Sequence, residues 1–156
     1  MKWTTTATLL LALAACGGKE ADDTGVLATA LFDAVSAGDE QAFLALHVRS
    51  GDTSPDGGAW LCTRAGGNRP DDAWTQELRK LFKRNRERFA ALKQTGAPSC
   101  GDVTSATRSV THVRDIRFAV AFGAKNFVGR IGSAMVAKRG LVIVGEPGGI
   151  EFLEAP

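Results

Sequence analysis

The chain of 156 residues contains no tyrosine, only two histidines and only three cysteines, and this scarcity limits its chemistry. Without tyrosine, a pocket lacks a common hydrogen-bonding group and acid. The formal net charge is only +2, too weak to suggest the strong positive field that binds nucleic acid. Nor is there an apolar run of the roughly 20 residues that a transmembrane helix needs. We therefore expect neither nucleic-acid binding nor a membrane-spanning helix.

The cysteines and histidines are also poorly spaced for metal binding or catalysis. His47, Cys62, Cys100 and His112 include no pair at the close spacing of C-x₂-C or H-x₃-H. Neither histidine has a neighbouring serine, cysteine or carboxylate pair in a nucleophile-and-base arrangement. We expect no catalytic residue, no metal and no cofactor, and we interpret both histidines as exposed or structural.

The N-terminus has the pattern of an export signal. Lys2 supplies a positive start, and the apolar run over residues 9–15 ends in small residues. The following stretch is small and polar, which is typical of a flexible tether. We therefore expect a signal peptide over 1–15, a tether over 16–23 and one α+β domain over 24–156.

The end of this signal carries a more specific motif. The junction Leu13-Ala14-Ala15-Cys16 resembles the lipobox of bacterial lipoproteins, in which an aliphatic and two small residues precede an obligatory cysteine. The resemblance implies that the Cys16 sulfur receives a diacylglyceryl group and that the leader is cut before Cys16. Gly17 in place of Asp implies the outer membrane in a Gram-negative source. The alternative is an ordinary secreted protein with a coincidental cysteine.

Hydrophobic periodicity predicts helices first and strands second, which is typical of an α+β fold. Thr24 is the expected cap of the first helix and Asp39 that of the second, and the two helices should form a hairpin. A mostly irregular loop, with room for a short strand at 60–63, should precede the long amphipathic helix. The expected helices cover 25–37, 40–47 and about 71–95, and the expected strands cover 116–122, 127–137, 141–144 and 150–153 as an antiparallel meander.

The order of elements adds a second resemblance. The phrase over residues 30–46, with Ala37-Gly38-Asp39 between two helices, resembles lipoprotein members of the NTF2-like superfamily. The resemblance implies a curved antiparallel sheet wrapped around helices into a cone, although no β-hairpin is evident between the second and third helices. A pocket in such a cone would be lined by Asn85, Phe89, Phe118 and Val120.

Three further features carry expectations. Asn85 falls within the apolar arc of the long helix, so its amide should either bond to the backbone or line a small polar cavity. Asp115 lies on the outward face of its strand, which favours an exposed salt bridge over a base. Seven cations against two acids on the long helix, a balance of +5, are interpreted as a solvated face, with anionic headgroups or wall polymers as the alternative.

Cys62 and Cys100 are the thiols that remain once Cys16 is lipidated. An even pair in an exported domain predicts a disulfide between them. Together these observations favour a membrane-anchored, non-enzymatic envelope lipoprotein that binds a partner protein, an envelope polymer or a small apolar ligand. An NTF2-like enzyme or ligand-binding protein and a purely structural spacer remain the alternatives.

Overall fold

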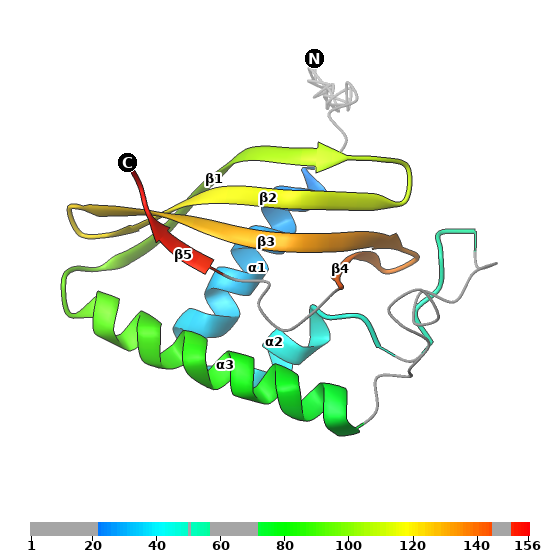
Figure 1. Cartoon of the computed structure of the whole chain (residues 1–156), viewed down its shortest axis with the longest axis horizontal. Coiled ribbons are helices and arrows are strands. Elements are labelled where there is room, and N and C mark those ends of the chain that lie inside the picture. The colour runs from blue at the N-terminus through cyan, green and yellow to red at the C-terminus, as the bar shows by residue number, and fades with distance from the viewer. Residues whose placement is uncertain (1–21, 50, 57–71, 145–150) are drawn as a thin grey trace, which may run out of the picture.

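The computed structural model describes residues 22–49, 51–56, 72–144 and 151–156, and within them three helices precede an antiparallel sheet (Figure 1). The fold is therefore α+β, as the periodicity predicted. Cys16, Cys62 and the strand expected near 60–63 lie outside the described residues. The elements are α1 Asp23–Ala37, α2 Glu40–Ala45, α3 Asp72–Lys93, β1 Pro98–Arg108, β2 His112–Phe122, β3 Lys125–Ala137, β4 Gly140–Ile143 and β5 Glu151–Glu154.

The first two helices are separated by a left-handed glycine and begin at aspartate caps. Asp22 accepts hydrogen bonds from the Gly25 N–H and from the hydroxyl of Thr24, so Asp22, and not the expected Thr24, caps α1. Thr24 is itself buried within the first turn. Gly38 ends α1 at φ 72°, and Asp39 caps α2 as predicted.

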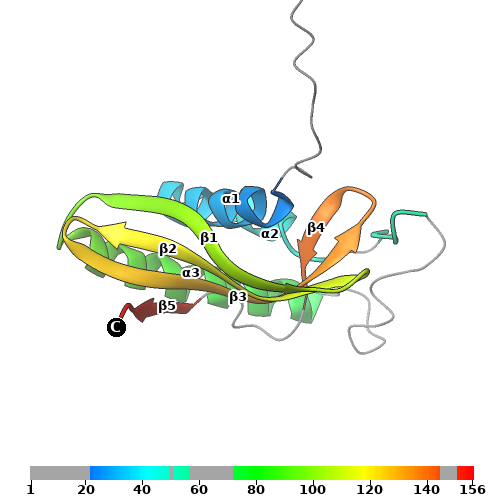
Figure 2. The same cartoon turned by 90° about the horizontal axis from the view of Figure 1, so that it is seen from above.

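The sheet order is β1-β2-β3-β4, and β5 pairs with β3. The meander prediction is confirmed for β2, β3 and β4 but is wrong for β5, which lies beside the first half of β3 and not beside β4. β1 was not predicted at all, because Pro98–Arg108 is mostly small and polar and shows no clear alternation. Figure 2 shows α1 along one face of the sheet, while Figure 1 shows α3 running below it.

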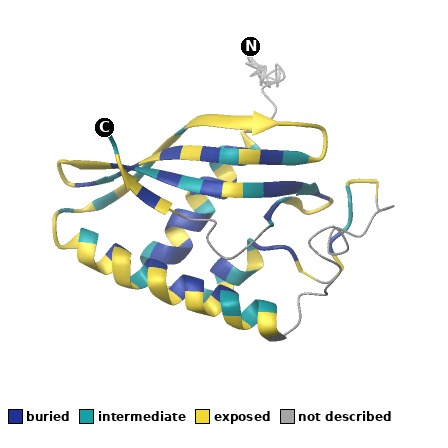
Figure 3. Cartoon of the chain, viewed as in Figure 1, coloured by how far each residue is buried: buried dark blue, intermediate teal, exposed yellow. Residues whose placement is uncertain are grey.

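The core forms where the inward face of β2 meets the helices (Figure 3). Every second residue from Ile116 to Phe122 is buried, as the alternation predicted. Phe122 packs edge-to-face on Phe89 of α3, with ring centroids 5.0 Å apart, and Phe89 packs on Phe32 of α1 at 5.6 Å. Aromatic rings therefore connect both long helices to the sheet.

Three of the seven cations of α3 contact other elements: Arg79 forms an exposed ion pair with Glu40 of α2 at 3.1 Å, and Arg86 and Arg88 bond to backbone carbonyls. The Arg86 guanidinium donates to the carbonyl oxygens of Val35 (2.6 Å) and Ser36 (3.0 Å), which satisfies the last turn of α1. Arg88 donates to the carbonyl of Phe152 in β5. The interpretation of the basic face as merely solvated is therefore wrong for Arg86 and Arg88, whose long side chains cross to neighbouring elements.

A glycine in β3 makes room for a buried ring of β2. Gly129 lies opposite Phe118 in the β2–β3 register, and a Cβ atom at Gly129 would stand 2.3 Å from Cζ of that ring. At Gly132, three residues further along the strand, a Cβ atom would meet nothing within 4 Å. The two glycines therefore form a matched pair within one strand.

We expect Gly129→Ala to lower the free energy of unfolding by about 1–3 kcal/mol, because the methyl group would displace a well-packed ring. Gly132→Ala is the control and should change stability by less than about 0.5 kcal/mol. Chemical denaturation followed by circular dichroism measures both values. Equal effects of the two substitutions would contradict the packing of Phe118 against Gly129.

Candidate functional site

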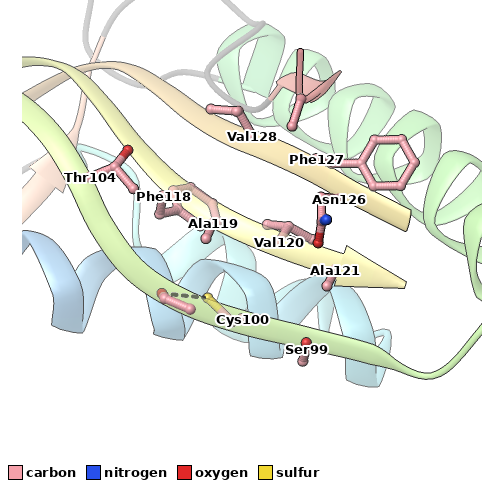
Figure 4. Close-up of a pocket in the computed structure, with 12 residues that line it drawn as sticks. Ser99, Cys100, Thr104, Phe118, Ala119, Val120, Ala121, Asn126, Phe127 and Val128 are labelled. Atoms are coloured by element: carbon pink, nitrogen blue, oxygen red, sulfur yellow. Dashed lines mark hydrogen bonds between the residues drawn. The ribbon is translucent and has the colours of Figure 1, made fainter. Parts of the chain in front are cut away.

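A shallow hollow of about 300 Å³ lies on the sheet, over the β1, β2 and β3 strands (Figure 4). Small side chains create it: Ala119 and Ala121 of β2 lie beside Gly101 of β1, where a Cβ atom would be 3.0 Å from that of Ala119. Val128 of β3 supplies a larger apolar side chain. The hollow therefore exists because its centre carries no large residue.

Neutral polar groups stand among the residues that line the hollow. Ser99 and Thr104 come from β1 and Asn126 from β3, and the Thr104 hydroxyl donates to the carbonyl of Arg117. The backbone of Ala155 lies nearby, and its N–H donates a hydrogen bond to the Asn126 carbonyl. None of the side chains that line this hollow is a carboxylate, an imidazole or a lysine.

The structure separates the four residues expected to line a pocket. Phe118 and Val120 are among the residues of the hollow, although both side chains are buried. Phe89 lies in the aromatic core, and Asn85 lies on α3 away from the hollow. The residues contributed by β1 were missed, because sequence reasoning did not detect that strand.

Asn85 is 5% exposed, and its Nδ2 has no hydrogen-bond partner among the described residues. Neither outcome expected from the sequence is established for this atom: no backbone acceptor is present among those residues, and the described hollows do not include Asn85. A buried amide hydrogen without an acceptor costs free energy. Asn85 is thus a weak point of the core.

The sheet also carries an ion-pair network. Asp115 of β2 accepts hydrogen bonds from Arg117 and Arg130, and Arg130 also contacts Glu151 of β5 at 3.5 Å. The hydrogen bond from Arg130, reinforced by the charge of Arg117, holds the pKa of Asp115 below its ordinary value. The expected exposed salt bridge is confirmed, and a carboxylate so engaged is a poor proton acceptor.

Cys100 is half-buried on the side of β1 that faces α1. Burial first, and then the nearby carboxylates of Asp33 and Asp102, raise the pKa of the Cys100 thiol. A raised pKa keeps the sulfur protonated and makes it a weak nucleophile. The thiol is free in this structure and contacts the Gly101 carbonyl at 3.7 Å.

The predicted disulfide partner, Cys62, lies outside the described residues. Thr53 accepts a hydrogen bond from the N–H of Lys138, just beyond the end of β3. Cys100 pairs with Val120 of β2, whose own partner, Phe127, lies near the start of β3. The eleven residues from Phe127 to Lys138 cover about 36 Å at strand spacing. The nine residues from Thr53 to Cys62 span at most about 31 Å. Because bonded Cα atoms stand about 6 Å apart, the two distances are just compatible, and the disulfide stays a prediction.

The second cluster of charged groups holds α2 against β4. Arg139 forms a two-point ion pair with buried Asp52 (2.6 and 3.0 Å) and donates to the carbonyl oxygens of Ala45 and His47. Burial alone would raise the pKa of Asp52, but the hydrogen bonds and charge of Arg139 overcome this and lower it. The guanidinium N–H groups thereby take the place of the backbone N–H donors that carbonyl oxygens at the C-terminal end of a helix lack.

Among the described residues, no three His, Cys, Asp or Glu side chains are grouped to hold a metal ion, and no helix is long and apolar enough to cross a membrane. No family model, curated protein or solved structure matches this chain. The site is therefore interpreted from its own chemistry.

His47 makes the fold sensitive to acid. Its ring is 3% exposed and its Nδ1 lies 2.9 Å from the Phe43 carbonyl; burial, partly opposed by that hydrogen bond, lowers the pKa of His47 to about 4 from its ordinary 6.5. The unfolded chain therefore binds the extra proton at higher pH than the folded chain does. Stability conferred by neutral His47 is present above pH 6.5 and is lost as the pH falls toward 4.

We expect the free energy of unfolding to fall by up to about 3 kcal/mol between pH 6.5 and 4. His47→Gln should remove most of this loss, whereas His112→Gln, which replaces the chain's other imidazole, should retain it. Urea denaturation at a series of pH values measures the effect. An acid-side loss that persists in His47→Gln would contradict the assignment to this histidine.

Proposed function

We propose that this chain is an envelope lipoprotein whose domain binds a partner protein or small apolar ligand through the hollow on its sheet. The lipobox resemblance supports the anchor. α1 begins at Asp23, so six residues separate the helix from Cys16 and hold the domain within about 25 Å of the lipid. Such a domain works close to its membrane.

The observation that carries the binding role is the composition of the hollow. Its small and apolar floor, with Ser99, Thr104 and Asn126 beside it, can bury apolar surface and supply a few directional hydrogen bonds. An enzyme of acid–base chemistry needs titratable groups that converge on its substrate. The one titratable side chain among the residues that line the hollow is the Cys100 thiol, and its raised pKa makes it a weak nucleophile.

We also propose that the domain is a member of the NTF2-like superfamily. The helix pair joined by Gly38 and Asp39, followed by a long helix and an antiparallel sheet, supports this proposal. In this chain, buried aromatic side chains fill the space between the sheet and the helices: Phe89, Phe118 and Phe122. An NTF2-like pocket enzyme is therefore the less favoured reading, and binding outside the core is the favoured one.

The anchor gives the first test. We expect mass spectrometry of the protein from a bacterial envelope to find an N-terminal peptide that begins at Cys16 and carries acyl chains. Cys16→Ser should abolish both the lipid and the cleavage, because its hydroxyl cannot replace the thiol. Normal processing of this variant, or a mature start elsewhere, would overturn the lipoprotein assignment.

The hollow gives the second test. A benzophenone amino acid at exposed Asn126 should form a discrete adduct when cells making the full chain are irradiated. Ala119→Trp, which fills the hollow from an exposed position, should reduce that adduct at least tenfold. The same amino acid at Glu87, on the exposed side of α3, is the control and should not form it.

If Asn126 gives no adduct, or gives the same adducts as Glu87, the hollow is not a binding surface and the spacer interpretation is favoured.

A further inference from the structure

The first strand leaves one edge of the sheet open. β1 pairs only with β2 among the described strands and spans eleven residues. Its centre, 103–107, contains only valine, threonine, serine and alanine, and its one proline stands at the first position. It carries no lysine, and its protection consists of the proline, one acid and one arginine outside this centre, and three register shifts against β2. Such edges readily accept another strand.

A groove runs beside this edge, between β1 and α1. Its volume is about 560 Å³, and its walls carry the carboxylates of Asp22, Asp33 and Asp102. Val26 of α1 lines the groove and is 67% exposed. The groove therefore combines an apolar wall with three carboxylates next to the open strand edge, and of these Asp22 lies near the charge of Arg108.

The complementary groups lie at the far end of the same strand. Val110, in the turn between β1 and β2, is 94% exposed. Arg108 ends β1 on the α1 side, where it contacts Asp23 and keeps a side chain that is 41% exposed. The edge thus presents an acidic, apolar-walled groove with Arg108 near Asp22, and the exposed Val110 lies two residues beyond Arg108.

We propose that a second copy of this chain pairs with β1 antiparallel, about a two-fold axis at Ser105. This register places Asp102 of each copy opposite Arg108 of the other, because both are three residues from Ser105. Directly opposed residues share a face of the sheet. Asp102 and Arg108 are both on the α1 side, so the opposite charges meet on one face.

The same register brings the exposed valines together. Val110 lies in the turn two residues beyond the end of β1, and this register brings that turn to the Cys100 end of the partner's β1, where Cys100 faces α1 next to Asp33. The turn of each copy therefore reaches the groove of its partner, where Val26 is exposed. Each contact occurs twice, as a two-fold interface requires. This self-association does not depend on the hollow or on the lipid anchor.

Photo-crosslinking in cells that make the full chain tests the proposal. A benzophenone amino acid at Val110 should give an adduct of twice the chain's mass that contains peptides of this chain only. The same group at Glu87 on α3 should give none. An adduct of another mass, or no adduct, would overturn self-pairing without bearing on the hollow, which Asn126 reports.

Charge substitutions test the register. Asp102→Arg should reduce the Val110 adduct at least tenfold, because two arginines then oppose each other at both ends of the pairing. Combining it with Arg108→Asp reverses both charges and should restore the adduct to at least half. Thermal melting must show that each variant is folded. An adduct unaffected by Asp102→Arg, or no recovery in the folded double variant, would overturn this register.

Discussion

The aromatic contacts between Phe32, Phe89, Phe122 and Phe127 are the constraint on which the rest of the structure depends. The rings follow one another at centroid distances of 5.6, 5.0 and 5.8 Å and connect α1, α3, β2 and β3. Burying such rings contributes the largest apolar areas in a small domain. Because strand residues alternate, placing the aromatics inward leaves alanines and charged residues on the opposite face of β2, where the hollow lies.

Long cationic side chains donate hydrogen bonds to backbone carbonyl oxygens at helix ends, which have no partner within their own helix. Arg86 donates to the last carbonyls of α1, and Arg139 donates to carbonyls at the end of α2 and just beyond it while it neutralises Asp52. A guanidinium suits this task because its several donors lie in one plane and it stays charged. Local charge counts along a helix therefore say little about binding: a cation of α3 that looks solvated in the sequence can be committed to another element.

The sequence predicted those elements in which one periodicity dominates. The alternation from Ile116 to Phe122 identified β2, and the apolar arc from Trp74 to Leu92 identified α3. It could not identify β1, whose edge position removes the need for an apolar face and whose register shifts disturb alternation. The pairing of β5 with β3 was also unpredictable, because a segment of four residues carries no sign of its partner.

The candidate site was hidden for the same reason. Phe118 and Val120 were predicted from their own strand, but the hollow depends on Gly101 and Ser99 of the undetected β1. Small residues become visible as a site only when neighbouring strands bring several of them together. Conversely, Asn85 and Phe89 stood out in the sequence through their position on α3, and that position places them in the core.

The two proposed surfaces have different relations to the anchor. Asp22 caps α1, lines the groove beside β1 and is the sixth residue after Cys16. If both proposals hold, the lipid chains of two paired copies leave close to their interface, and attachment to one membrane raises the effective concentration of each copy for the other. A modest edge contact can then persist at the membrane surface. The hollow uses Ala119 and Ala121 on the opposite face of the sheet, but β1 also lines it, so a partner bound there would lie next to the paired strand.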